Sequence, residues 1–220
     1  MSKLYRLTTI RERRVLTFSG WVVLLMAFGS VLFSIALFIH PFLAPIKPVG
    51  GDILVVGTFK YDNAKKIKEW FEKGPYKLLV TFGRKFPVGH PLEQYKSSAH
   101  WAATKLNAQG VPLKKIIPVQ VTGYPKKDRT YYKAIKIKER LNKMGIIQAS
   151  IDVASNGVHA RRSWFLFEKA FSSVDVGIIS IKPKGYDVTR WWLYSEGVRS
   201  VISESIAYLY ARFIFSPPSK

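Results

Sequence analysis

The 220-residue sequence contains no cysteine. This absence excludes disulfide frameworks, Cys-ligated zinc, iron–sulfur clusters and thiol catalysis. Acidic residues are also scarce: 14 Asp and Glu stand against 35 Lys and Arg, so the formal net charge is +21. That balance excludes an acidic solvating protein, and a hydrophobic content of 48% excludes a disordered basic tail. The length suffices for one well-buried domain but not for two full α/β domains.

Several signatures of nucleotide binding and catalysis are missing as well. Gly50 and Gly51 precede the first buried run instead of following it, so the G-x-G-x-x-G turn of dinucleotide-binding proteins is absent. Neither a P-loop nor a G-x-S-x-G nucleophile elbow occurs. Metal-ligand spacing is not found among the four histidines, which are His40, His90, His100 and His159. The sequence therefore predicts no metal and no cofactor.

One long apolar run lies near the N-terminus. No residue between Phe18 and Ile39 is charged, and a helix over these positions is about 33 Å long, enough to cross a hydrocarbon core of about 30 Å. We expect a basic cytoplasmic segment over residues 1–17 and a transmembrane anchor over residues 18–40. A cleaved signal peptide is the alternative, although this run exceeds the usual signal-peptide core of about 7–15 apolar residues. The basic cluster Arg11–Arg14 predicts a cytoplasmic N-terminus and an extracytoplasmic C-terminal domain.

A single domain is expected over residues 52–220, after a short Pro/Gly linker over residues 41–51. Apolar runs rich in β-branched residues predict five buried strands, over residues 52–59, 76–83, 116–122, 149–155 and 176–181. Amphipathic stretches predict helices between them, over residues 63–73, 91–108, 128–144 and 159–171. This alternation is typical of a single Rossmann-like α/β fold: an open parallel sheet of about five strands with helices on both faces.

A last helix is expected from Gly197 to Phe215. Its apolar residues fall on one helical stripe: Val198, Val201, Ile202, Ile206, Leu209, Tyr210 and Phe213. We interpret this stripe as packing on the sheet. An amphipathic helix on the membrane surface is the alternative.

The loops that follow the predicted strands are strongly cationic, and ligands of open parallel sheets bind beyond the carboxyl ends of the strands. The candidate ligand-binding cations are Arg84, Arg129, Arg161 and Arg162. Guanidinium groups near helix N-termini suit a phosphate or another anion. His159 is a candidate for proton transfer and Asp128 a candidate for orienting Arg129 or another basic partner, so both are candidate catalytic residues. A lone histidine only weakly supports a metal site with Asp62 or Asp128.

Several segments carry a family resemblance. Val153–Phe171 (VASNGVHARRSWFLFEKAF) is similar to the pattern V-T-S-x-x-H-x-x-R-A, with a loop one residue longer before His159, and Asp128–Ala134 (DRTYYKA) is similar to a T-x-E-N-A element. A GVP loop at residues 110–112 precedes the third predicted strand, and Asp187–Arg199 reads D-x-x-x-WW-x-x-SEGVR. Together these segments resemble the ElyC/SanA/YdcF-like domain family of bacteria, in its membrane-anchored branch. The resemblance covers residues 52–215.

The resemblance adds two ligand-binding candidates. The pocket positions of the family correspond here to Thr130, Ser155, His159 and Arg162. Tyr132 and Lys133 stand where the broader family has Glu and Asn, which removes an acid and an amide from the expected pocket and adds a cation.

For the anchored branch, the resemblance implies a role in building the cell envelope, around peptidoglycan or its undecaprenyl-phosphate lipid carrier. We therefore expect a single-pass protein of the bacterial cytoplasmic membrane, with its C-terminal domain in the periplasm. Its expected partners are the lipid bilayer and a phosphorylated or anionic lipid or glycan, such as a cell-wall or polysaccharide precursor. The main hypothesis is that the protein binds this ligand, and an extension of it is that the protein also processes the ligand. A non-catalytic membrane scaffold of envelope assembly is the first alternative.

A nucleic-acid-binding protein is the second alternative, because the net charge and the tryptophans Trp101, Trp164, Trp191 and Trp192 suit such a partner. These aromatics follow helical or core patterns and not an exposed stacking row. No nucleic acid is therefore expected as a partner.

Overall fold

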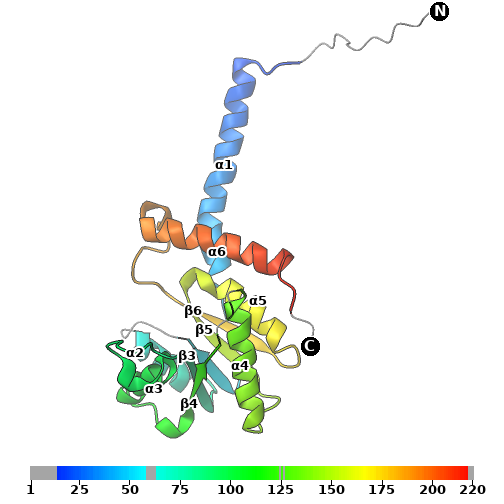
Figure 1. Ribbon diagram of the computed structural model, residues 1–220. Coiled ribbons are helices and arrows are strands. Elements are labelled where there is room, and N and C mark those ends of the chain that lie inside the picture. The colour runs from blue at the N-terminus through cyan, green and yellow to red at the C-terminus, as the bar shows by residue number, and fades with distance from the viewer. Residues whose placement is uncertain (1–13, 58–62, 124, 126, 218–220) are drawn as a thin grey trace, which may run out of the picture. The chain divides into compact units, whose positions relative to one another are not determined.

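The computed structural model describes residues 14–57, 63–123, 125 and 127–217 (Figure 1). The chain divides into two compact units, residues 1–38 and residues 39–220. Most of the expected cytoplasmic segment lies outside the described residues. So does Asp62, named above as a possible partner of His159.

The expected membrane segment is helical. Helix α1 (Phe18–Leu43) contains 26 residues, and its most apolar window has a mean hydropathy of 2.7 with no residue buried. The Thr17 hydroxyl accepts a hydrogen bond from the Gly20 N–H at 3.1 Å and so caps its first turn. By length and composition α1 can cross a membrane, a property that it shares with N-terminal signal sequences. That α1 lies in the bacterial cytoplasmic membrane, that it is not cleaved off and that its N-terminus is cytoplasmic are still predictions.

The second unit is built on one six-stranded sheet. Five of its strands are parallel: β2 (Ile53–Val56), β3 (Leu78–Arg84), β4 (Ile116–Val121), β5 (Ile151–Asn156) and β6 (Val176–Ile181). The spatial order is β1-β6-β5-β2-β3-β4, in which β1 (Ile46–Lys47) pairs antiparallel with β6. The five predicted strands are confirmed, and β1 adds a short edge strand from within the expected linker.

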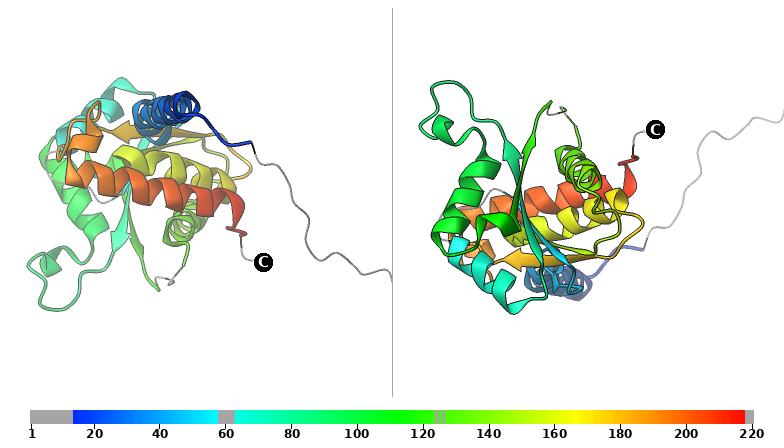
Figure 2. Two further views of the ribbon diagram at one scale, coloured as in Figure 1. Left: turned by 90° about the horizontal axis from the view of Figure 1, so that it is seen from above. Right: turned by 90° about the horizontal axis from the view of Figure 1, so that it is seen from below.

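Helices cover both faces of the sheet, as the sequence predicts (Figures 1 and 2). Helices α2 (Ala64–Lys73) and α3 (Ser98–Ala108) share one core with the sheet, and α4 (Arg129–Lys143) and α5 (Ala160–Ala170) share the other. The central strand β2 contributes to both, because its side chains alternate between the faces. Ile53 and Val55 join the α4/α5 core, and Leu54 and Val56 join the α2/α3 core.

Helix α3 begins later than predicted. The Ser97 hydroxyl accepts a hydrogen bond from the His100 N–H at 3.3 Å, and this N-cap starts the helix at Ser98 instead of near residue 91. The preceding residues contain a short 3₁₀ turn, η2 (Glu93–Tyr95), and similar turns precede β4 and α5, at η3 (Leu113–Lys115) and η4 (Gly157–His159).

A buried carboxylate fixes the expected linker to the sheet. Asp152 is 0% exposed and accepts hydrogen bonds from the N–H groups of Val49 (2.8 Å), Gly50 (3.1 Å) and Gly51 (3.1 Å). The Tyr76 hydroxyl donates a fourth bond at 2.9 Å. Burial and the bond to Asp152 raise the pKa of this phenol. Because one carboxylate holds three successive backbone groups, this segment is an ordered part of the domain and not a loose tether.

Helix α6 (Ser195–Phe213), preceded by η5 (Trp191–Leu193), corrects one sequence interpretation. Its apolar stripe does not pack on the sheet. Among the stripe residues only Val201 is buried, whereas the most outward ones, Ile202, Ile206, Leu209, Tyr210 and Phe213, are exposed. The reason is that α2, α3, α4 and α5 already cover both sheet faces. Helix α6 therefore packs through its opposite side on α5 (Figure 2).

Candidate anion-binding site

A cavity of about 1080 Å³ lies at the carboxyl ends of the parallel strands. Its lining includes Gly57 after β2, Arg84 at the end of β3 and Asn156 at the end of β5. The strand order reverses at this place, because β2 leads outward to β3 on one side and β5 leads to β6 on the other. Doubly wound sheets bind their ligands at such a switch point. The cavity thus lies where the sequence predicts a site.

The charged side chains that line this cavity are all cations. Arg84, Lys85, Arg129 and Lys133 contribute, and no Asp or Glu is among the described lining residues. In the part of the chain that the structure describes, no carboxylate forms an ion pair with Arg84 or Arg129. Burial, followed by the charges of Arg129, Arg162 and Arg84, lowers the pKa of Lys133. The described lining of the cavity is therefore positively charged, which suits an anion.

Small hydroxyl groups stand beside these cations. Thr130 in the first turn of α4 and Ser155 near the end of β5 are both buried and both line the cavity. The Ser155 Oγ lies 3.2 Å from the Ser163 Oγ on α5. These hydroxyls can donate hydrogen bonds to oxygen atoms of a bound anion.

A second cavity of about 440 Å³ adjoins the first, and the two share Arg129, Thr130, Lys133 and His159. Its remaining lining comes from Asp128 before α4, from α5 and from α6, through Arg162, Leu166, Ala207, Tyr210 and Ala211. Helix α6 is thus one wall of this second space.

Arg162 holds α6 through a bidentate ion pair. Its Nε donates to Glu204 Oε2 and its Nη2 donates to Glu204 Oε1, both at 2.9 Å, while Nη1 lies 3.5 Å from Thr130 Oγ1. The Arg162 and Glu204 side chains are 22% and 19% exposed. Burial alone would raise the pKa of Glu204, but hydrogen bonds from His159 and Arg162 and their charges lower it to about 2. Arg162 therefore joins α4, α5 and α6, a structural role that the sequence analysis did not anticipate.

His159 is anchored at one ring nitrogen. Its Nδ1 lies 3.1 Å from Glu204 Oε2 and 3.0 Å from Arg162 Nη2. A protonated Nδ1 donates to Glu204, whereas an unprotonated Nδ1 accepts from Arg162, so only one of these hydrogen bonds forms at a time. In both cases Nε2 stays outside this network, and the residue lines both cavities. The arrangement leaves Nε2 as the nitrogen suited to move a proton.

The structure brings most of the predicted site residues together. The main cavity is lined by Arg84, Arg129, Thr130, Ser155 and His159, and the second cavity is lined by Asp128, Arg129, Thr130, His159 and Arg162. Asp128 has a left-handed backbone (φ +51°) directly before α4. Within the described residues it forms no ion pair with Arg129 or with another basic residue, so the expected orienting contact is not found there.

Arg161 is the predicted residue that the structure places elsewhere. Its Nε donates to the Phe42 carbonyl oxygen at 2.8 Å, and its guanidinium carbon lies 4.3 Å from the centre of the Phe42 ring. Successive residues of a helix point about 100° apart, so Arg161 and Arg162 face different neighbours. Arg161 contacts the last turn of α1 and does not line either cavity.

Glu204 is the site residue that the sequence analysis missed. The available signal was a single carboxylate on the side of the last helix opposite its apolar stripe. This carboxylate indicates a buried ion pair only once that side of the helix is known to pack against the domain.

No group of three or more His, Asp or Glu suited to a metal ion is found among the described residues. No protein-family model matches the chain, and no curated protein matches its sequence. The resemblance to the ElyC/SanA/YdcF-like family and the function that it implies therefore stay predictions.

Proposed function

We propose that this chain is a membrane-anchored protein whose cationic cavity binds a phosphorylated ligand. By its chemistry the ligand is a phosphate monoester or diphosphate attached to an apolar or glycan portion. A phosphorylated glycolipid, an undecaprenyl-phosphate-linked cell-wall precursor or a polysaccharide precursor fits this description.

The observation that supports the proposal is the cationic character of the described lining of the main cavity. Four cations line it, no carboxylate is among its described lining residues, and the pKa of Lys133 is lowered partly by its cationic neighbours. Such mutual repulsion between like charges costs free energy. A phosphate dianion relieves this cost and pairs with guanidinium forks in two-point contacts.

The rest of the lining favours an amphiphilic ligand over a free inorganic ion. Phe82, Val153, Phe167 and Ile181 contribute apolar surface to the same cavity. Its volume of about 1080 Å³ also exceeds what one phosphate group needs. A ligand with a charged head and an apolar portion would use both kinds of lining.

Retention of α1 as an anchor is supported by how its last turn is built into the domain. Within the second unit, His40 and Leu43 are buried, and His40 Nε2 lies 3.2 Å from the Tyr186 Oη. Removal of this turn by a signal peptidase would uncover the apolar site that Leu43 fills. The proposal therefore treats the apolar run as an uncleaved anchor.

The role in building the cell envelope is implied by the family resemblance alone. The alternative, a non-catalytic membrane scaffold, would also be anchored by α1 but would bind no phosphorylated ligand. The two are separated by titrating the detergent-solubilised full chain with farnesyl phosphate, a short polyprenyl phosphate, and with farnesol, by isothermal titration calorimetry. Inorganic phosphate serves as a third titrant. We expect farnesyl phosphate to bind more tightly than either of the other two.

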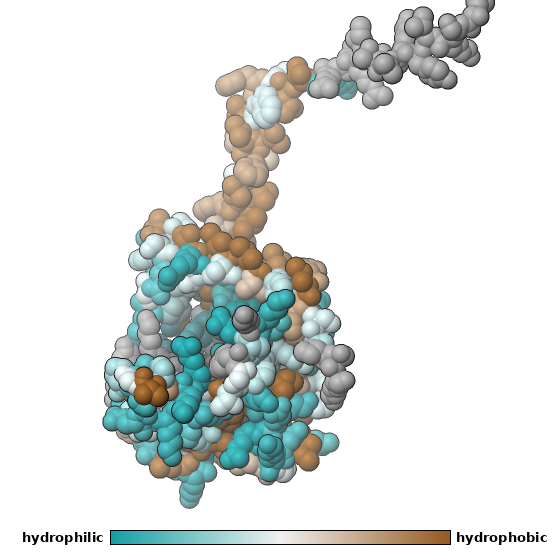
Figure 3. All heavy atoms as spheres, viewed as in Figure 1, coloured by the Kyte–Doolittle hydropathy of each residue, from teal (hydrophilic) through white to brown (hydrophobic). Residues whose placement is uncertain are grey.

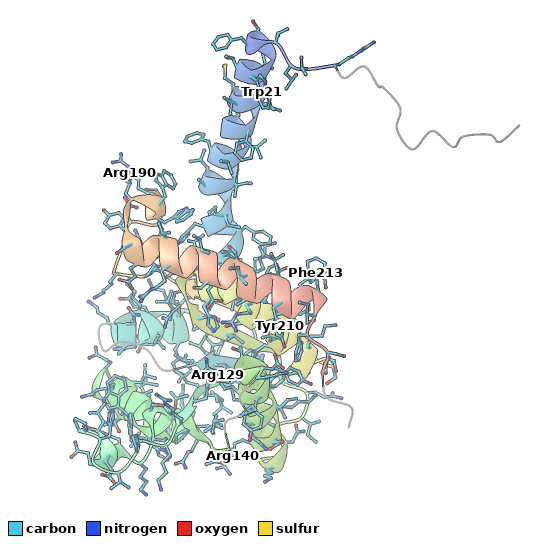
Figure 4. The ribbon with its side chains drawn as sticks, turned by 45° about the horizontal axis from the view of Figure 1, so that its top comes forward. Trp21, Arg129, Arg140, Arg190, Tyr210 and Phe213 are labelled. Atoms are coloured by element: carbon cyan, nitrogen blue, oxygen red, sulfur yellow. The ribbon has the colours of Figure 1, made fainter. Side chains whose placement is uncertain are left out.

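The matched variants are Arg129→Gln and Arg140→Gln, which change the same residue type at opposite ends of α4 (Figure 4). Only Arg129 lines the cavities. We expect Arg129→Gln to weaken farnesyl phosphate binding about 10- to 100-fold, as for a lost charge-assisted hydrogen bond, and Arg140→Gln to leave it unchanged. Equal affinity for farnesol, or equal effects of the two variants, would overturn the proposal and favour the scaffold.

A further inference from the structure

Helix α6 presents an apolar outer stripe to solvent. We define the outer stripe as Ile202, Ile206, Leu209 and Phe213, which follow one another at spacings of four, three and four residues and so share one face of the helix. Their side chains are 51% to 78% exposed. Figure 3 shows the resulting apolar band along α6.

The opposite side of the same helix carries its contacts with the domain. Gly197, Val201 and Ala211 are buried there, and Glu204 pairs with Arg162. The apolar side of α6 therefore faces outward, and the side with the charged pair faces inward. This is the reverse of the usual pattern for a surface helix of a water-soluble domain.

Chain connection keeps α6 close to the end of the apolar run. The Phe42 ring packs edge-to-face on the Tyr208 ring of α6, with 5.6 Å between the ring centres, inside the second unit. Phe42 follows Phe38, the last residue of the first unit, by four helical residues. At 1.5 Å per residue this is about 6 Å of helix. The middle of α6 thus contacts a residue that follows the first unit by only four positions along the chain.

The charges around the outer stripe complete the argument. Arg199 and Arg212 are exposed and lie on the two flanks of the stripe. The acidic residues of α6, Glu196 and Glu204, lie off the stripe, and Glu204 is paired inward. An apolar face flanked by arginines matches the headgroup region of an anionic bilayer, where an interfacial helix buries its apolar side and places its cations beside lipid phosphates.

From this geometry we infer that α6 is an interfacial membrane helix: its outer stripe inserts into the lipid surface that α1 crosses. The inference uses the anchor of the proposed function but not the ligand of the cavity. If the cavity bound no phosphate, α6 would still dock on the bilayer.

The test uses the natural absence of cysteine, so that one introduced cysteine is a unique labelling site. The full chain carrying Ile206→Cys is labelled with an environment-sensitive fluorophore and reconstituted into liposomes containing anionic phospholipid. The matched control is Ile147→Cys, between α4 and β5, because Ile147 and Ile206 are 67% and 64% exposed. Quenching is measured with aqueous iodide and with lipids spin-labelled in their acyl chains.

We expect the probe at position 206 to be quenched by the spin-labelled lipids and to be several-fold less accessible to iodide than the probe at position 147. The same contrast is expected at Phe213→Cys. Equal iodide accessibility at positions 206 and 147 in liposomes would refute the inference. Protection at position 206 that persists in detergent, together with disulfide crosslinking between copies of the unlabelled Ile206→Cys chain, would refute it in favour of a second copy of the chain on this face.

Discussion

The ion pair between Arg162 and Glu204 predicts a specific loss of stability in acid. The pKa of Glu204 is about 2 in the folded chain, against an ordinary value of 4.5. A carboxyl whose pKa falls on folding stabilises the folded state fully above its unfolded pKa and loses that contribution as the pH falls through the folded pKa. The difference corresponds to about 3 kcal/mol, which should disappear between about pH 5 and pH 2.

The assay is urea unfolding of the detergent-solubilised full chain, followed by tryptophan fluorescence, from pH 6 to pH 2.5. Glu204→Gln removes the titrating group but keeps an oxygen that accepts from Arg162. We expect this variant to be less stable than the natural chain at pH 6 and to approach it as the pH falls. Glu139→Gln is the control, because Glu139 pairs with Lys136 on the exposed side of α4 at 2.7 Å, and such surface pairs contribute about 0–1 kcal/mol.

A parallel pH dependence of the natural chain and Glu204→Gln would refute the reasoning, because it would show that Glu204 does not titrate differently in the folded and unfolded states. An identical response of the Glu204 and Glu139 variants would do the same. The comparison also bears on Arg162: an Arg162→Ala substitution should unseat α6 as well as alter the cavity. Loss of ligand binding in that variant would therefore not by itself identify a ligand contact.

Three further predictions concern the sheet and the cavity. Asp152→Ala should lower the free energy of unfolding by about 3–5 kcal/mol, because three backbone N–H groups and the Tyr76 hydroxyl lose their acceptor; a loss below 1 kcal/mol in chemical denaturation would contradict this. Gly177→Ala should cost about 2 kcal/mol or more, because the added Cβ would meet the Asp152 carboxylate, and the two losses should not add in the double variant. The acylation of Lys133 by an amine-specific reagent, measured by mass spectrometry as a function of pH, should have its midpoint below the ordinary lysine pKa of 10.5. Farnesyl phosphate should suppress this reaction. A midpoint at or above pH 10.5 would argue against the cationic surroundings of Lys133.

The parallel sheet could be predicted from the sequence because its strands are mostly buried and rich in apolar residues, most clearly in β2. All four residues of β2, Ile53–Val56, are buried, and two face each core. The cavity could be placed as well, since parallel strands end at a common edge. The candidates Arg84, Arg129 and Ser155 belong to three elements, and this shared edge brings them together.

Features that depend on packing between distant elements could not be predicted. The stripe on α6 has the same periodicity whether it packs on the sheet or faces outward, and only the coverage of both sheet faces by other helices shows that it faces outward. Arg161 and Arg162 are equivalent in the sequence, but the direction of α5 sends one to Phe42 and the other to Glu204. Asp152 reads as an ordinary polar residue in a strand until three distant N–H groups are seen to converge on it.

The hydrogen bonds of Asp152 have a consequence for how the domain would search for a ligand. They hold residues 49–51 to the sheet, and β1 and the last turn of α1 belong to the same unit. If α1 is embedded in a bilayer, no long linker separates it along the chain from the domain that holds the cavity. The domain would encounter ligands by lateral diffusion in two dimensions, so molecules that share the same leaflet would have a kinetic advantage over dissolved ones.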